Sequence, residues 1–225
     1  MHVADLLREA LDTAALECWQ RERTATPGRA FAVRLHAAGC SLRETAAILG
    51  LLGVERTHGA VWNWVHRLAD SVPDPPTAQP SRVAVDETAV RINGEWSWAY
   101  AAIELETKVL PDAAVFGRRG TDPAAAFLHG LTQKHDCSQA VFLVDGFGYL
   151  TALSRLGLSG RLDYADRNHI ENWFHTLKMR VDRFHSSWVG SRRSVRQWLA
   201  SFVHYYNVQR PHQALDERTP VEEEN

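Results

Sequence analysis

A proline-rich segment separates two regions of the chain whose hydrophobic patterns differ. Four prolines fall within eight residues, at Pro73, Pro75, Pro76 and Pro80. Proline fixes φ and lacks a backbone donor, so such a run continues neither a helix nor a central strand. We therefore expect a linker at 71–81, a small helical domain at 1–70, a larger domain at 82–208 and a C-terminal tail at 209–225.

The composition is that of a globular protein, because 45% of the 225 residues are hydrophobic and 23% are charged. No apolar run approaches the roughly 18 residues that span a bilayer. The first residues also lack the basic start and apolar block of a signal peptide. We therefore expect a cytoplasmic protein with no membrane partner. Cys18, Cys40 and Cys137 are spaced for neither a zinc site nor a disulfide framework.

The region before the prolines has the pattern of three short helices at about 30–70. The first ends at Gly39, a typical C-cap, and Ser41 and Glu44 form a capping box at the start of the second. The third follows Thr57 and buries one face, formed by Val61, Trp64, Val65 and Leu68. We interpret this region as a helix-turn-helix, although a packing or dimerisation unit is the alternative.

The third helix supplies the candidate base contacts, since a recognition helix enters the major groove with its exposed face. The residues left off its buried face are Trp62 and four polar or basic side chains, His58, Asn63, His66 and Arg67. Asn and Arg side chains make bidentate contacts with base edges.

The region after the prolines changes to strands and then alternates with helices, which predicts an α/β fold. Strands are expected at 82–86, 96–102, 109–116 and 140–145, with an Asn93-Gly94 hairpin turn after the first. Helices are expected at 121–135, 147–156, 168–184 and 191–207. The sheet is therefore flanked by helices.

Two of these strands end in an aspartate. Asp86 follows Val-Ala-Val and Asp145 follows Phe-Leu-Val. Ligands of open α/β sheets bind outside the strand ends, which is where such carboxylates lie. Each Asp alone is also explained by a turn or a helix cap. Glu87 is not counted as a candidate, because strand alternation turns it to the opposite face.

The helix at 168–184 carries a polar stripe next to its apolar one. Glu171 and Lys178 share a face, with Asn168 one turn earlier. A solvated polar face is the ordinary interpretation. However, the neighbouring cations Arg167, Arg180 and Arg183 surround Glu171, as expected for a site that handles phosphate and metal. Three carboxylates suit Mg²⁺, which prefers oxygen ligands, and pairs of such ions promote phosphodiester chemistry.

These residues give the chain a resemblance to a known family. Asp86, Asp145 and Glu171, with Lys178 seven positions later, resemble the DDE motif of transposases and retroviral integrases. The stretches that carry the likeness most closely to insertion sequence family six are Val85–Thr88, Phe142–Gly146, Asp166–Glu171 and His204–Leu215. The interval from Asp145 to Glu171 is shorter than is usual in that family, so Gly157–Arg167 is expected to be a compressed connection.

The resemblance implies an RNase H-like catalytic domain behind a helix-turn-helix. It also implies a nucleoid-associated homodimer that binds terminal repeats and target DNA, and uses two Mg²⁺ ions, with Mn²⁺ as a substitute. Asp86, Asp145 and Glu171 would be metal ligands and catalytic residues together with Lys178. The expected DNA contacts are His58, Asn63, His66, Arg67, Arg167, Asn168, Lys178, Arg180, Arg192, Arg193 and Arg210. A catalytically silent DNA-binding relic and an RNase H-class nuclease are the alternatives.

Overall fold

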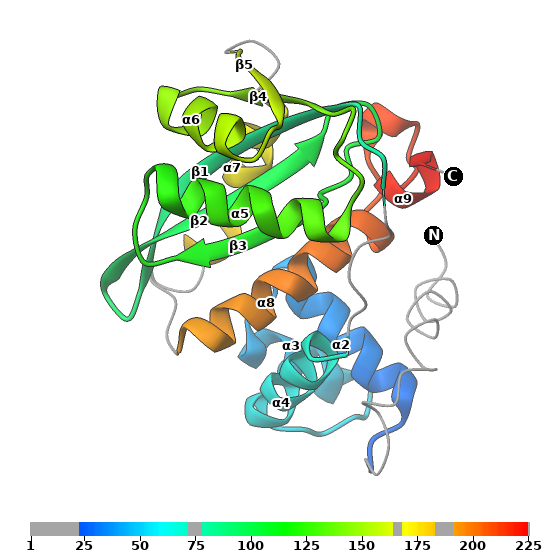
Figure 1. Ribbon diagram of the computed structural model, residues 1–225. Coiled ribbons are helices and arrows are strands. Elements are labelled where there is room, and N and C mark those ends of the chain that lie inside the picture. Colours follow the sequence, from blue (N-terminus) through cyan, green and yellow to red (C-terminus); the bar gives the residue numbers. More distant parts are fainter. Residues whose placement is uncertain (1–22, 72–77, 164–167, 183–190, 225) are drawn as a thin grey trace.

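The computed structural model describes residues 23–71, 78–163, 168–182 and 191–224 (Figure 1). The part of the linker at 72–77 and the candidate DNA contact Arg167 lie outside the described residues. None of the helices in the described ranges combines the length and apolar character that crossing a bilayer requires.

A five-stranded mixed sheet forms the centre of the molecule. Its strands are β1 Arg82–Ile92, β2 Glu95–Glu104, β3 Asp112–Phe116, β4 Val141–Val144 and β5 Ser159–Leu162. They lie in the order β3-β2-β1-β4-β5. The three strands β1, β2 and β3 are antiparallel neighbours, whereas β1, β4 and β5 run parallel. The mixed sheet agrees with the predicted fold class.

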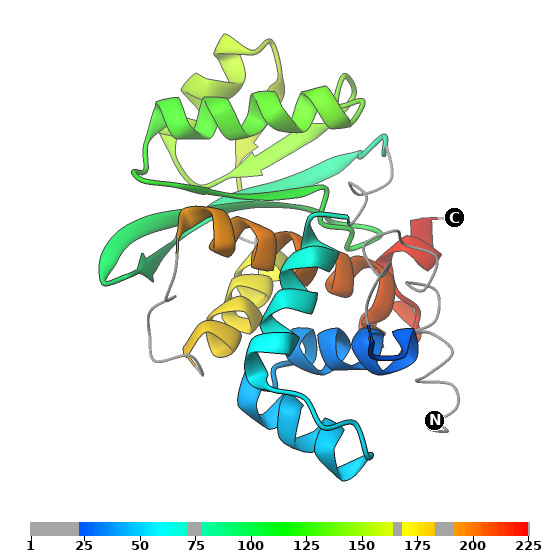
Figure 2. The same ribbon diagram turned by 90° about the horizontal axis from the view of Figure 1, so that it is seen from below.

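Helices cover both faces of this sheet (Figures 1 and 2). The helices are α2 Thr26–Ala38, α3 Leu42–Leu51, α4 His58–Ala69, α5 Thr121–Lys134, α6 Phe147–Arg155, α7 Asn168–Asp182, α8 Arg192–His204 and α9 Pro220–Glu224. One face packs against α5 and α6. The other packs against α7 and α8, with α2–α4 beyond them. The Ser41–Glu44 capping box and the left-handed C-cap at Gly39 are both present, as predicted.

Strand alternation divides the interior into two cores. Val83 and Val85 of β1 point into the core under α5 and α6. Ala84, between them, belongs to the second core, which also contains Trp173 of α7 and Trp64 of α4. The N-terminal helices therefore share one continuous apolar core with the sheet, α7 and α8.

Two details of the strands differ from the sequence-based expectations. β1 does not end at Asp86 but continues for six residues to Ile92, so this aspartate lies inside the strand. The segment at 157–167 is more than a connection, because it contains the edge strand β5. Its Ser-Gly-Arg-Leu sequence has none of the apolar alternation by which strands are found. Gly160 suits this position, because a Cβ would overlap the Leu153 side chain of α6 and lie 3.0 Å from the Phe142 carbonyl oxygen.

The Tyr-Tyr-Asn stretch at the end of α8 has a structural role. The helix expected at 191–207 is α-helical only to His204 and continues as a π-helical turn at Tyr205–Gln209. Asn207 is 2% exposed. Its side chain accepts a hydrogen bond from the backbone N–H of Leu110 and donates one to the Leu110 carbonyl, both at 2.9 Å. Asn207 thus fixes the connection between β2 and β3 to the end of α8.

This clamp predicts a large stability loss for Asn207→Ala. The substitution leaves a buried N–H and a buried C=O of Leu110 without partners, at about 1–3 kcal/mol for each group. We expect the free energy of unfolding, measured by urea denaturation, to fall by roughly 2–4 kcal/mol. Val208→Ala, at the exposed next position, is the control and should change it by less than about 0.5 kcal/mol. Equal losses in the two variants would contradict the clamp.

Candidate active site

The pairing of β1 with β4 brings two aspartates together. In this parallel ladder Arg82 pairs with Val141, Val83 with Phe142 and Ala84 with Leu143. Paired residues in this register are 59 positions apart in the sequence, and so are Asp86 and Asp145. Extending the register by two residues therefore sets the two backbones side by side, about 4.8 Å apart.

Both aspartates belong to the face of the sheet that α7 covers. Ala84 and Leu143 lie in the core on the α7 side, whereas Val85 and Val144 lie in the core under α5 and α6. Side chains alternate along a strand, so the next residue on the α7 side is Asp86 in β1 and Asp145 after β4. Asp86 is 9% exposed, and Asp145, directly after the end of β4, is half-buried.

A third acid lies beside this pair on the opposite face. Glu87 accepts a hydrogen bond from the Tyr149 hydroxyl of α6, which confirms that alternation turns it away from α7. Burial raises the pKa of Glu87 above its ordinary value, and the neighbouring charges of Asp86 and Asp145 raise that pKa further. The backbone N–H of Glu87 donates to Asp86 Oδ1 at 2.8 Å. Three acidic groups are thus within electrostatic reach of one another.

Helix α7 presents Glu171 and Lys178 on its exposed side. The helix packs against β1 and β2 through buried side chains that include Ile170, Trp173 and Leu177. Among the described residues, no three His, Cys, Asp or Glu side chains are gathered closely enough to hold a metal ion. The structure therefore places Asp86 next to Asp145. That Glu171 belongs to the same site stays a prediction.

The region that contains these residues matches a known protein family. A family model described as a DDE domain, named for IS240 transposases, matches residues 80–212. The chain belongs to this DDE domain family. The matched range includes all three acids, Asp86, Asp145 and Glu171.

Relatives and solved structures extend the comparison. Uncharacterized protein MJ0017 of Methanocaldococcus jannaschii is 23% identical over 192 residues, which cover 84% of this chain and 89% of that protein. The cryo-EM structure of a simian T-cell lymphotropic virus intasome in complex with PP2A regulatory subunit B56 gamma covers 86% of this chain and 74% of its own, with a TM-score of 0.50 and 13% identity. The structure of the HTLV-2 integrase catalytic core domain in complex with magnesium has a TM-score of 0.47 and 7% identity, and the match covers 66% of this chain and 99% of that chain. The intasome likeness supports the RNase H-like fold that was predicted.

The other candidate contacts around the DDE domain lie on several elements. Asn168 begins α7 and is exposed, and Arg180 lies in the same helix, with its side chain outside the described residues. Arg192 and Arg193 form the exposed first turn of α8. Arg210 lies over the Tyr206 ring, with its guanidinium carbon 5.5 Å from the ring centroid. Among the described side chains, Arg192 and Arg193 therefore lie at the start of α8 and Arg210 lies beyond its other end.

Helix α4 presents most of its candidate base contacts to the outside. His58, Asn63 and Arg67 are exposed, whereas His66 is half-buried. His66 Nδ1 is hydrogen-bonded to Gln197 Oε1 of α8 at 2.8 Å. His66 therefore helps to dock α4 on α8, and its contact with bases stays a prediction.

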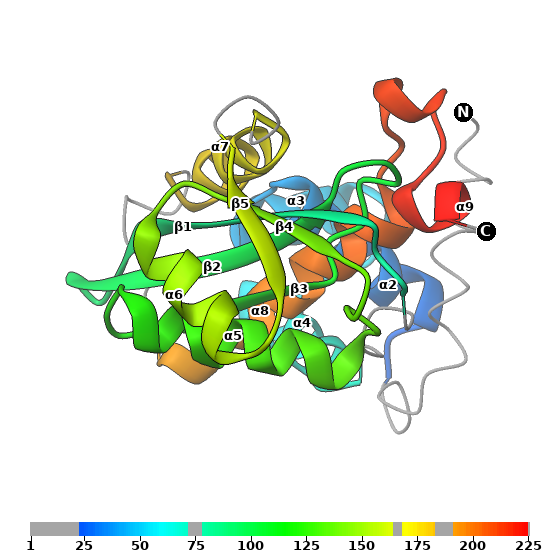
Figure 3. The same cartoon turned by 45° about the horizontal axis from the view of Figure 1, so that its top comes forward.

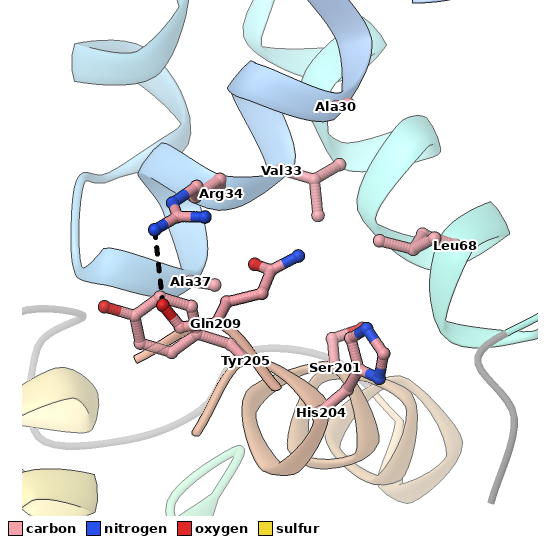
Figure 4. A pocket seen from close by; sticks show the side chains of 9 residues that line it. All are labelled: Ala30, Val33, Arg34, Ala37, Leu68, Ser201, His204, Tyr205 and Gln209. Atoms are coloured by element: carbon pink, nitrogen blue, oxygen red, sulfur yellow. Dashed lines mark hydrogen bonds between the residues drawn. The ribbon is translucent and has the colours of Figure 1, made fainter. Parts of the chain in front are cut away.

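The docking surface between the N-terminal helices and α8 is tightly packed and polar in places. Arg34 of α2 donates a hydrogen bond to the Gln209 carbonyl at 3.3 Å (Figure 4). A cavity of about 20 Å³, lined in part by Ser201 and His204, lies beside this contact. That volume is sufficient for a single water molecule.

Two histidines between the N-terminal helices and α8, His36 and His204, have a lowered pKa. Burial lowers the pKa of His204, and burial is also the largest influence that lowers the pKa of His36. The hydrogen bond between His36 Nδ1 and the Cys40 carbonyl opposes this shift, whereas the nearby His66 adds to it. Protonation of either ring therefore weakens the packing of α2 and α4 on α8.

These shifts predict that stability falls in mild acid. Both folded pKa values lie below the unfolded value of 6.5, so the unfolded chain binds more protons as the pH drops through that value. We expect the free energy of unfolding to decrease between about pH 7.5 and about pH 5.5. His204→Gln should flatten this dependence in urea titrations. A wild-type free energy of unfolding that is constant over this range would contradict the lowered pKa values of His36 and His204.

Proposed function

We propose that this DDE domain protein is a DNA transposase of insertion sequence family six. The observation that carries the proposal is the register-matched pair Asp86 and Asp145 on the sheet face covered by α7, the helix that bears Glu171 and Lys178. The comparisons support a polynucleotidyl transferase of the DDE class. The substrate class, the element ends and the two-step reaction are part of the proposal.

The reaction consists of two phosphoryl transfers at one site. In the first, water attacks the phosphorus at the element end, the P–O3′ bond breaks, and the element keeps a free 3′-OH while the flank keeps a 5′-phosphate. In the second, this 3′-OH attacks a phosphorus of target DNA, and the target's own 3′ oxygen leaves with the proton. The second step needs no external energy source, since it breaks one phosphodiester bond of the target and forms another between element and target.

The acids of the site fit a divalent metal. Asp86, Asp145 and Glu171 would hold two Mg²⁺ ions, with Mn²⁺ as a substitute, because carboxylate oxygens are the ligands these hard cations prefer. The like charges that raise the pKa of Glu87 form a local excess of negative charge, which a divalent cation neutralises. When bound, such ions supply Lewis-acid stabilisation of the charge on the reacting phosphate.

The protein residues outside this acidic centre would position DNA. Lys178 lies two helical turns after Glu171 and is exposed, so it would hold a phosphate next to the scissile bond. The exposed α4 residues His58, Asn63 and Arg67 would contact bases of the terminal repeat. A working homodimer is proposed because the two ends of an element must be handled together.

The opposite orientation of Asp145 and Glu87 gives a matched test. Asp145→Asn should abolish both cleavage and strand transfer on a labelled duplex that carries the element end, in the presence of Mg²⁺. Glu87→Gln should retain both reactions, because its side chain faces α6 and the amide still accepts the Tyr149 hydrogen bond. The assay is the electrophoretic separation of cut and joined products.

A second measurement separates metal binding from chemistry. Mn²⁺ should raise the melting temperature of the wild type and of Glu87→Gln, but not that of Asp145→Asn, since a ligand that binds only the folded state stabilises it. Cleavage without joining in the wild type would indicate a nuclease. Full activity of Asp145→Asn would show that the Asp86 and Asp145 pair is not the catalytic site.

Lys178→Ala tests whether the polar face of α7 contacts DNA. Loss of one phosphate contact should reduce the slope of log affinity against log salt by about one unit. The unfolding free energy should change by less than about 0.5 kcal/mol, because the side chain is exposed. Met179→Ala, also exposed, is the control and should leave DNA binding unchanged. Unchanged end binding and strand transfer in Lys178→Ala would mean that this face is only solvated.

A further inference from the structure

The β1–β2 hairpin and the loop after β3 lie together at one end of the sheet. Strands β1, β3 and β4 all run in the same direction, because β2 is antiparallel to both β1 and β3, and β4 is parallel to β1. Their carboxyl ends are followed by the Asn93-Gly94 hairpin turn, by the loop 117–120 and by Asp145. Figure 3 shows the β1–β2 hairpin and the end of β3 on the same side of the molecule. Asp145 is level with Asp86, six residues before the end of β1, so the hairpin turn and the loop 117–120 lie beyond the candidate acids.

Arginines stack on tryptophans along this edge. The Arg91 guanidinium carbon lies 4.5 Å from the centroid of the Trp96 ring, and that of Arg119 lies 4.9 Å from the centroid of Trp98. Trp98 pairs with Phe116 in the antiparallel ladder, so the same register continued by two residues sets Arg118 opposite Trp96. The hairpin and the loop 117–120 thus form one surface.

The first turn of α8 adds a third element to this surface from the other face of the sheet, because Val115 lies in the core that α8 shares, whereas Trp98 and Phe116 pack against the core under α5 and α6. A Cβ on Gly117 would lie 3.0 Å from Nη2 and 3.1 Å from Nη1 of Arg192, so the guanidinium lies directly against the glycine backbone. One turn later, Arg196 Nη2 donates to the Val115 carbonyl at 3.2 Å. The arginine–tryptophan surface is defined by Arg91, Trp96, Trp98, Arg118, Arg119 and Arg192.

The charge of this surface is poorly balanced by the protein itself. Within the described ranges, Arg91, Arg119 and Arg192 form no ion pair with a carboxylate. Arg118 pairs with Asp122 at 3.3 Å, but both side chains are mostly exposed, and Asp122 is shared with Arg155. Such exposed pairs contribute little. Arg192 also lies at the positive end of the α8 dipole, where a cation is unfavourable.

We propose that the arginine–tryptophan surface binds the phosphate backbone of duplex DNA at the hairpin end of the sheet, beyond the acidic centre. This inference rests on the proposed function and adds a surface to it. Planar guanidinium groups bind phosphate oxygens in a bidentate manner, and stacking on a tryptophan holds the plane in place. Because arginines already cover one face of Trp96 and of Trp98, the surface offers charge more than rings, which favours a backbone over unstacked bases.

The position of the surface agrees with a single duplex that also reaches the acids. Asp145 is level with Ala113 of β3, so Arg118 lies about 14 Å across the sheet and about 17 Å along it from Asp145. The combined separation of about 22 Å corresponds to roughly six base pairs of duplex rise. Arg119 also acts electrostatically on Glu87, the neighbour of Asp86. A duplex that contacts the arginines and is longer than about six base pairs would therefore extend as far as the level of the acids.

The test uses the full-length protein and a fluorescein-labelled, mixed-sequence duplex of about 30 base pairs. Arg119→Ala and Arg192→Ala should each weaken binding about five- to tenfold and reduce the salt slope by about one unit. Arg119→Lys should keep the slope, because it keeps the charge. Arg218→Ala removes an exposed arginine that is paired with Glu223 near the C-terminus, and it should bind like the wild type.

The outcomes separate this surface from the proposed reaction. If the wild type joins no DNA but the two Ala variants still weaken duplex binding, the surface stands and the transposase proposal fails. If both Ala variants bind the duplex as tightly as Arg218→Ala does, the surface is refuted even when strand transfer is normal. A loss of affinity only for a single-stranded DNA or RNA probe of the same length would also overturn it. Unchanged melting temperatures confirm that each variant is folded.

Discussion

The parallel pairing of β1 with β4 is the interaction on which the candidate site depends. β1 is the only strand that joins the antiparallel and the parallel parts of the described sheet. Its register sets Asp86 opposite Asp145, and a slip by one residue would turn every β1 side chain to the other face. The fully buried Val83 and Val85 fix this register, because each would otherwise leave the core under α5 and α6. Apolar packing on one face thus determines where the carboxylates point on the other.

Helix α8 connects the parts that the proposed reaction would use. Its middle holds α4 through the Gln197 hydrogen bond to His66, and its first turn lies against the loop after β3 through Arg192 and Gly117. Its end is fixed to the sheet by Asn207. DNA held by α4 would consequently have a set position relative to the acids. The shared core supports this coupling, since the N-terminal helices pack on α7 and α8 as one apolar cluster.

Local patterns predicted what is determined locally. The helix caps at Gly39 and Ser41, the position of Asp145 after a buried strand, and the orientation of Glu87 all follow from short-range rules, and all were found. The length of β1 was missed, because its apolar run ends at the charged pair Asp86-Glu87, and the residues after this pair are in the strand through their pairing with β2. The polar edge strand β5 and the role of Asn207 were missed for a similar reason. Each depends on a partner distant in sequence, which is Val141–Val144 for β5 and Leu110 for Asn207.

The near-neutral net charge of −2 conceals two opposite local charges at one end of the sheet. Asp86, Glu87 and Asp145 repel one another and favour a cation, whereas Arg119 and Arg192 lack carboxylate partners in the described ranges and favour an anion. Arg119 acts electrostatically on Glu87, but it forms no ion pair with a carboxylate in the described ranges, so neither group neutralises the other fully. A divalent metal and a DNA phosphate would satisfy both sets at once. In this interpretation, the two charge clusters lower the stability of the free protein, and the same unfavourable energy is released when metal and DNA bind together.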